Sequence, residues 1–393
     1  MKDGKKMLFA KQKNFLLTLI CGILLIGILA VVPTGYEDAV IYQGTERAVG
    51  KVTEVNNSAI LTSGLIQSGE QTCTLVIEDG IFKGKELEGV NFLSGSLEKD
   101  KVFEVGDRAL LTISYEGDVV KSVVISDHYR LDREVLLLAV FALLLMVFAG
   151  KNGLQAILSF IITILAIWKI LVPCYLKGYS PIWIGILITV ALTAIIIFFV
   201  YGVDKRTAVG VLGSLLGVLT TCILGILFTD LFKIHGAIMS NAESLLYSGY
   251  EHLDLTAIYM SSIFIGASGA MMDLAVDITS AVHEVVQKKP DIGRLEAVKS
   301  GMNVGRAAMG TMTTTLLLAY SGGYVTLLMV FMAQGTPIDH ILNYKYVAAE
   351  VLDTIVGSFG LVTVAPFTAV VAGLLLTNKP KKLKKESLKE NIR

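Results

Sequence analysis

The residues of this sequence that could carry chemistry are acidic and lie in and beside an apolar stretch. Asp273, Asp277, Ser280 and Glu284 follow one another at intervals of four, three and four residues. On an α-helix such positions share one face. A carboxylate inside a bilayer costs about 2.5 to 3.5 kcal/mol on insertion scales, so it must face protein, water or a cation. Two interpretations stay open: a proton or cation site, and an acidic stripe at the membrane surface that pairs with basic residues.

The next apolar stretch begins with a second polar stripe, formed by Asn303, Arg306, Gly310 and Thr313. We expect Arg306 to lie at about the depth of the two aspartates. The simplest prediction pairs its guanidinium with one of them, which would offset part of the burial cost of each charge. The alternative is that Arg306 extends to the membrane surface.

Glycines mark two further features of the apolar stretches. Gly213, Gly217 and Gly266 belong to small-residue stripes that favour close helix packing in lipid. Gly322 and Gly323 follow Ser321 and favour a break in the helix, which is tolerated only where it lines protein or a cavity. In the last stretch Asp353 lies about two turns from the start and needs a partner.

Composition identifies the class of protein. Of 393 residues 53% are hydrophobic and 17% are charged, against about 25% charged in soluble chains. Basic and acidic residues balance at 34 each, so net charge indicates no nucleic-acid partner. The five histidines and four cysteines show no ligand spacing, and we expect neither metal nor cofactor. Without an HExxH or Gly-x-Ser-x-Gly motif, we expect no enzyme.

Eight apolar segments are long enough to suggest membrane spans. They are residues 15–32, 134–149, 154–172, 182–201, 207–229, 255–276, 306–332 and 346–376. Lysine and arginine are concentrated in the head, in alternate short connections and in the tail, which places both termini in the cytoplasm. We therefore expect a polytopic α-helical protein of the bacterial plasma membrane, with a retained anchor helix.

The only sizeable polar segment lies between the first and second spans. It contains short runs that alternate like strands, near residues 39–42, 49–55, 73–77, 109–113 and 119–125, with turn signals between them. We predict an extracytoplasmic β-rich domain, either OB-like or a sandwich. The predicted organisation is head and anchor at 1–33, β domain at 34–132, a seven-helix membrane domain at 133–377 and a basic cytoplasmic tail at 378–393.

Several stretches resemble the YibE/F-like family of bacterial membrane proteins, and its YibE-like branch in particular. They are Gly266–Asp273, Gly305–Thr313, Leu317–Tyr320 and, in the last span, Glu350 with Gly357-Ser-Phe-Gly-Leu. The resemblance covers about 130–376, and 34–130 more loosely. It implies an integral membrane protein presumed to transport, working with a smaller relative that lacks the outer domain. This chain has Ala307 where the family favours an acidic residue, and Asp353 where it favours a basic one.

Two functions compete. The first is a transporter, or a transporter subunit, coupled to protons or cations, with a pathway near Asp273, Asp277, Asn303, Arg306, Thr313 and Asp353. The second is a membrane scaffold or assembly factor that binds a partner through the outer β domain. In either function the expected partner is the lipid bilayer, and both functions are compatible with an oligomer.

Overall fold

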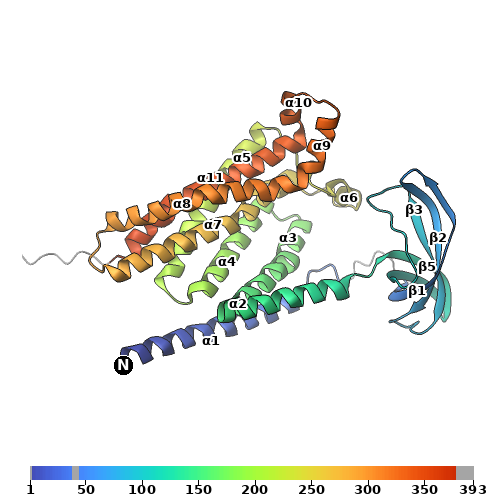
Figure 1. Cartoon of the computed structure of the whole chain (residues 1–393), viewed down its shortest axis with the longest axis horizontal. Helices are drawn as coiled ribbons and strands as arrows, with labels where there is room; N and C mark the ends of the chain where they lie inside the picture. Colours follow the sequence, from blue (N-terminus) through green and yellow to red (C-terminus); the bar gives the residue numbers. More distant parts are fainter. Residues whose placement is uncertain (1, 38–43, 378–393) are drawn as a thin grey trace, which may run out of the picture. The chain divides into compact units, whose positions relative to one another are not determined.

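The computed structural model describes residues 2–37 and 44–377 (Figure 1). Its contacts divide the chain into two compact units. The helical unit contains the residues up to Gly35 and those from Phe148 onward, and the barrel unit runs from Tyr36 to Val147. The predicted strand at 39–42 and the predicted basic tail at 378–393 lie outside the described residues.

The long helices account for most of the described chain. They are α1 Lys2–Val31, α2 Leu131–Ala166, α4 Pro181–Tyr201, α5 Lys205–Leu231, α7 Leu255–Lys288, α8 Arg294–Ser321 and α11 Lys345–Leu375. The shorter ones are α3 Val172–Leu176, α6 Ala242–Tyr247, α9 Val325–Ala333 and α10 Ile338–Asn343. Seven stretches of the described residues are long and apolar enough to cross a membrane.

The described part of the structure has seven candidate stretches and the sequence predicted eight spans, because one stretch of the structure contains two of the predicted spans. α2 continues through a π-helical turn, Ile167–Leu171, into α3, so the stretch Leu131–Leu176 has 46 residues. At ~1.5 Å per residue it is about 69 Å long, roughly twice the hydrocarbon core. Gly150 interrupts it with φ 53° and ψ −123°, which are not helical. The second and third predicted spans lie on either side of this glycine, and the eight-span count stays a prediction.

The core of the helical unit is built where α5, α7, α8 and α11 meet. A Cβ atom at Gly213 would overlap Thr368, and one at Gly217 would overlap Val364. On α8, a Cβ at Gly305 would lie 2.8 Å from the Cβ of Ala365. Small residues therefore let these backbones approach closely, which is the packing mode of helices in lipid.

The barrel unit contains a closed five-stranded barrel with the order β1-β2-β3-β5-β4. Its strands are β1 Thr45–Ser63, β2 Ile66–Ile77, β3 Glu86–Ser94, β4 Arg108–Glu116 and β5 Val119–His128. Neighbouring strands run antiparallel except β3 and β5, which pair in parallel at Val90 and Val124. Of the two predicted architectures the barrel is therefore the one present. Strand β3 was not predicted, because Gly89 and Asn91, residue types that are depleted in strands, lie in its middle.

A buried polar network fastens the long β3–β4 connection to the barrel. The Gln71 amide donates to the Phe103 carbonyl at 2.8 Å, and the Phe103 N–H donates back to Gln71 Oε1 at 2.9 Å. Asn91 Nδ2 donates to Gln71 Oε1 and to the Lys101 carbonyl. Because Gln71 and Asn91 are fully buried, these bonds offset the desolvation of the Gln71 amide and of the Asn91 NH₂ group. Asn91 Oδ1 is buried with no hydrogen-bond partner among the described residues.

Candidate functional site

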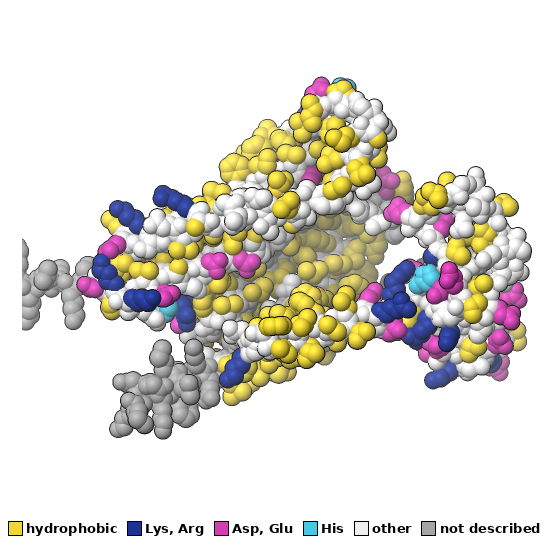
Figure 2. Space-filling model, in the orientation of Figure 1, with side chains coloured by type: hydrophobic (Ala, Val, Ile, Leu, Met, Phe, Trp, Pro, Cys, Tyr) yellow, Lys and Arg dark blue, Asp and Glu magenta, His cyan; other side chains and the backbone are white. Residues whose placement is uncertain are grey.

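The two aspartates of α7 reach the surface of the helical unit. Asp273 and Asp277 are exposed although they lie well inside a stretch long enough to cross a membrane. Among the described residues neither forms an ion pair. Asp277 interacts electrostatically with Tyr201, whose hydroxyl lies 2.7 Å from both the Val276 carbonyl and Ser280 Oγ. Figure 2 shows acidic side chains, in magenta, on a part of the helical unit whose neighbouring surface is apolar or uncharged.

The polar stripe of α8 is exposed as well. Asn303, Arg306 and Gly310 are exposed, and Thr313 is half-buried with its hydroxyl donating to the Met309 carbonyl at 2.9 Å. In the part of the chain that the structure describes, Arg306 forms no ion pair. The expected pair between Arg306 and an aspartate of α7 is therefore absent within one copy of the chain. The reason is geometric: Gly301 and Gly305 face α7 and α11, which turns Arg306 outward.

A second acidic pair lies near the start of α11. Glu350 and Asp353 are one helical turn apart and partly buried. One oxygen of each carboxyl group, Glu350 Oε1 and Asp353 Oδ1, is buried with no hydrogen-bond partner among the described residues. No lysine or arginine of residues 14–37 and 44–377 forms an ion pair with either group. Of the predicted site residues, Asp353 is thus separate from the α7 aspartates and belongs to another cluster.

Three tyrosines complete this cluster, and sequence reasoning missed them. Tyr259 of α7 and Tyr320 of α8 interact electrostatically with both carboxyl groups. Tyr324, in the short 3₁₀ turn Gly322–Tyr324, interacts directly with Glu350. The Tyr259 hydroxyl donates to the Ala349 carbonyl at 2.9 Å, which ties α7 to α11 at this level. The sequence did contain one signal for two of these tyrosines: Tyr320 lies just before the predicted helix break and Tyr324 just after it.

The predicted glycine positions have different roles. Gly213 and Gly217 are packing glycines, and Gly266 faces Tyr320, whose Oη would lie 3.0 Å from a Cβ there. Gly310, Gly322 and Gly323 face open space. α8 ends at Ser321 as predicted, but the chain continues through a tight helical turn into α9, so no extended segment separates the two helices.

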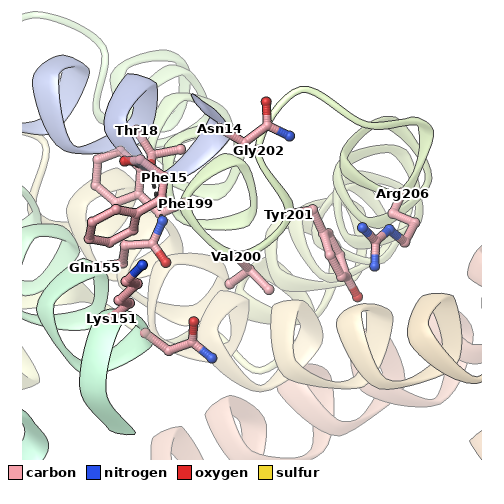
Figure 3. A pocket seen from close by; sticks show the side chains of 11 residues that line it. Asn14, Phe15, Thr18, Lys151, Gln155, Phe199, Val200, Tyr201, Gly202 and Arg206 are labelled. Carbon is pink, nitrogen blue, oxygen red and sulfur yellow. Dashed lines mark hydrogen bonds between the residues drawn. The ribbon is translucent and has the colours of Figure 1, made fainter. Parts of the chain in front are cut away.

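A pocket of about 510 Å³ with a mixed polar and apolar lining opens among α1, α2, the end of α4 and the start of α5 (Figure 3). Thr18 of α1 accepts a hydrogen bond from Gln155 Nε2 at 2.7 Å. The Lys151 ammonium lies 5.1 Å from the centre of the Phe15 ring. Arg206 is paired with Asp204 at 3.1 Å and stacks on Tyr201, so its charge is largely compensated.

No group of three or more histidine, cysteine, aspartate or glutamate side chains in the described chain is placed to hold a metal ion. All four cysteines are free thiols.

These helices define the class: a multi-pass membrane protein that carries a small β-barrel after its first helix. The family model described as YibE/F-like protein matches residues 137–378. The chain belongs to the YibE/F-like family, as its motifs predicted. The match does not extend to residues 34–130, where the resemblance was looser. No curated protein and no solved structure matches the chain.

Proposed function

We propose that this protein is a transporter, or a subunit of one, coupled to protons or cations. The observation that carries the proposal is the Glu350–Asp353 pair. Two carboxyl groups one turn apart lie in a candidate span, each with a buried oxygen that has no hydrogen-bond partner in the described chain. Acidic residues placed so within a membrane mark ion pathways and proton relays. The pair supplies oxygen ligands for a cation or acceptors for a proton.

The pathway we propose continues along α7 to a second acidic pair. Tyr259 contacts the Glu350–Asp353 cluster, and Asp273 follows it by about 21 Å along the helix at ~1.5 Å per residue. Asp273 and Asp277 on α7, together with the polar stripe Asn303, Arg306 and Thr313 on α8, form the second part of the proposed pathway. Replacing Asp273 with Asn should abolish transport while the protein is still expressed.

The test does not require the solute to be known. Purified protein in liposomes is adsorbed on a solid-supported membrane, and charge displacement is recorded after steps in pH, Na⁺, K⁺ or Mg²⁺. We expect a displacement for at least one of these ions with the wild type, and its loss in Glu350→Gln/Asp353→Asn. Asp339→Asn, an exposed acidic residue of α10, is the matched control and should respond like the wild type.

Two outcomes would contradict the proposal. If the wild type gives no charge displacement with H⁺, Na⁺, K⁺ or Mg²⁺, none of these ions binds to it, and the proposed coupling is wrong. A displacement that survives in the Glu350→Gln/Asp353→Asn variant assigns ion binding elsewhere.

The alternative, an assembly role for the β domain, is favoured by one observation. An apolar patch is exposed at the end of the β1–β2 hairpin. Leu65 and Leu97 are 83% and 70% exposed and line one shallow depression, and Ile66 lies beside them. Such patches mark interaction sites. If this role dominates, Leu65→Glu with Leu97→Glu abolishes function, whereas neutralising the acidic residues of the spans has little effect.

A further inference from the structure

Polar and small residues of α7 and α8 are exposed at the surface of the helical unit, where charged side chains are costly in lipid. We group them under the name α7–α8 face, which consists of Gly269, Asp273 and Asp277 on α7 with Asn303, Arg306, Ala307, Gly310 and Thr314 on α8. All are exposed except Gly269, which is half-buried. The buried residues of α8 are Ala297, Gly301, Gly305 and Leu316, which lie on one side of the helix. α8 therefore packs with one side only and leaves its polar side uncovered.

The two glycines of this face have open space where a side chain would stand. A Cβ atom at Gly269 or Gly310 would meet nothing within 4 Å, in contrast to Gly213 and Gly217, where it would overlap α11. Asn303, Ala307, Gly310 and Thr314 form a stripe of small and polar side chains at helical spacing. In lipid such a stripe is typical of a surface that receives another helix.

The charges on the face are opposite in sign but form no ion pair among residues 14–37 and 44–377, whose side chains the structure describes. Asp277 lies about three turns before the end of α7 at Lys288, and Arg306 about three turns after the start of α8 at Arg294. At ~1.5 Å per residue, both lie about 17 Å from the connection that joins the helices. Asp273 lies one turn farther. A rotation about an axis along the membrane normal keeps this depth, so Arg306 of one copy reaches the level of Asp277 in another.

We propose that the α7–α8 face is the interface of a homodimer with twofold symmetry. In a twofold interface the same patch meets itself, so a patch that contains both members of an ion pair makes that pair twice. Arg306 of each copy lies opposite Asp273 and Asp277 of the other, and the small-residue stripe lets the two α8 helices approach. The second copy thereby supplies the counter-ion that neither aspartate has among the described residues of its own chain. This inference holds whether or not the protein transports.

The test uses two full-length variants with different affinity tags. Arg306→Asp leaves only negative charge on the face, and Asp277→Arg leaves two arginines against Asp273. Each variant is expected to be mostly monomeric alone, with a dimer dissociation constant at least tenfold above that of the wild type.

Expressed together, the two variants should co-purify as a heterodimer. The aspartate introduced in one copy then faces the arginine introduced in the other, and the native Arg306 faces the native Asp277. A pair formed within one chain cannot produce this result. Lys205→Asp, at the start of α5, is the control and should dimerise like the wild type.

A second measurement guards against variants that fail to fold. In a background whose four native cysteines are replaced, Asn303→Cys or Gly310→Cys should form a disulfide-linked dimer in membranes, and Leu212→Cys on the exposed side of α5 should not. Three results overturn the proposal: a wild type that is monomeric in lipid nanodiscs, charge variants that each dimerise like the wild type, or a stoichiometric complex with a different membrane protein through this face.

Discussion

Among single residues, Glu350 and Asp353 each have a buried carboxyl oxygen with no hydrogen-bond partner in the described chain. Buried charges in proteins are normally paired or bound to a cation. Here the neighbours are tyrosines, which supply hydroxyl groups but no positive charge. A ligand that binds such a site in the folded state must stabilise the protein by mass action.

The first prediction concerns this coupling between ligand binding and the stability of the folded protein. In a thermal unfolding series with chloride salts of choline, Na⁺, K⁺ and Mg²⁺, or with falling pH, the bound cation or proton should raise the Tm of the wild type. At a ligand concentration about 100 times the Kd, the stabilisation is about 2.7 kcal/mol. Asp353→Asn should lose this ligand-dependent increase and Asp339→Asn should keep it. Equal increases in all three proteins would show that the effect is not site-specific.

The second prediction concerns Cys73 on β2. Its side chain is fully buried in the barrel, and burial, with a smaller contribution from Asp107, raises the pKa of the thiol to about 11. The reactive thiolate is therefore rare near neutral pH, and the sulfur is inaccessible. Mass spectrometry after maleimide treatment should find Cys73 unmodified in the native protein and modified after denaturation. Rapid native labelling would show that the barrel opens.

Among the elements, the turn after β3 depends on one carboxylate. Asp100 accepts hydrogen bonds from the backbone N–H groups of Ser94, Gly95 and Ser96 and from the Ser94 hydroxyl. These bonds, that of the Ser94 N–H first, lower the pKa of Asp100 below its usual value. Because they favour the ionised form, they stabilise the turn only while Asp100 carries its charge.

The third prediction follows from the sign of that shift. A carboxyl whose pKa is lower in the folded state contributes stability above its unfolded pKa, about 3.9 for aspartate, and loses it as pH falls through the folded value. Asp100→Asn should therefore speed hydrogen exchange in the segment 94–104 at neutral pH. The difference from the wild type should shrink as pH falls below the unfolded pKa of about 3.9 and through the lower folded value. A difference that does not depend on pH would mean that the charge is irrelevant.

The fourth prediction contrasts two glycines of the membrane helices. Gly217→Val would force a side chain into α11, and overpacking of this kind costs about 1 to 3 kcal/mol. Gly310→Val faces open space in one copy of the chain and should leave monomer stability unchanged, but it should weaken the proposed dimer. Thermal unfolding and the oligomer mass in nanodiscs separate the two effects. If Gly310→Val unfolds the monomer, α8 has a neighbour within its own chain.

For the molecule as a whole, the number of spans decides on which sides the termini lie. Seven spans place them on opposite sides of the membrane, and eight place them on the same side. The stretch Leu131–Leu176 decides the count, because its length and the non-helical Gly150 allow two crossings. The concentration of lysine and arginine in the head and the tail favours the same side.

The fifth prediction tests whether the number of spans is even or odd. Reporter fusions at the two termini should both be active in the cytoplasm, and a fusion in the barrel unit should be active only outside it. A small tag inserted at Lys151–Asn152 should be accessible from the cytoplasm if the chain turns at Gly150. Termini on opposite sides would exclude the eight-span arrangement.

Composition and spacing along the chain were enough to identify the membrane class, the position of the β domain and most helix limits, and motifs that resemble the YibE/F-like family identified the family. These properties are local, so they are readable without knowledge of which residues become neighbours. The end of α8 at Ser321 and the packing role of Gly213 and Gly217 were predicted for the same reason.

Which residues meet became visible only in the folded chain. Folding separated Asp353 from the α7 aspartates, surrounded it with tyrosines from two other helices, and turned Arg306 away from the partner that equal depth had suggested. The depth of a residue in a membrane follows from its position along the helix. The direction in which its side chain points depends on which face of the helix packs against the neighbouring helices. Gly301 and Gly305 fix that face for α8, and their contacts with α7 and α11 span residues far apart in the sequence.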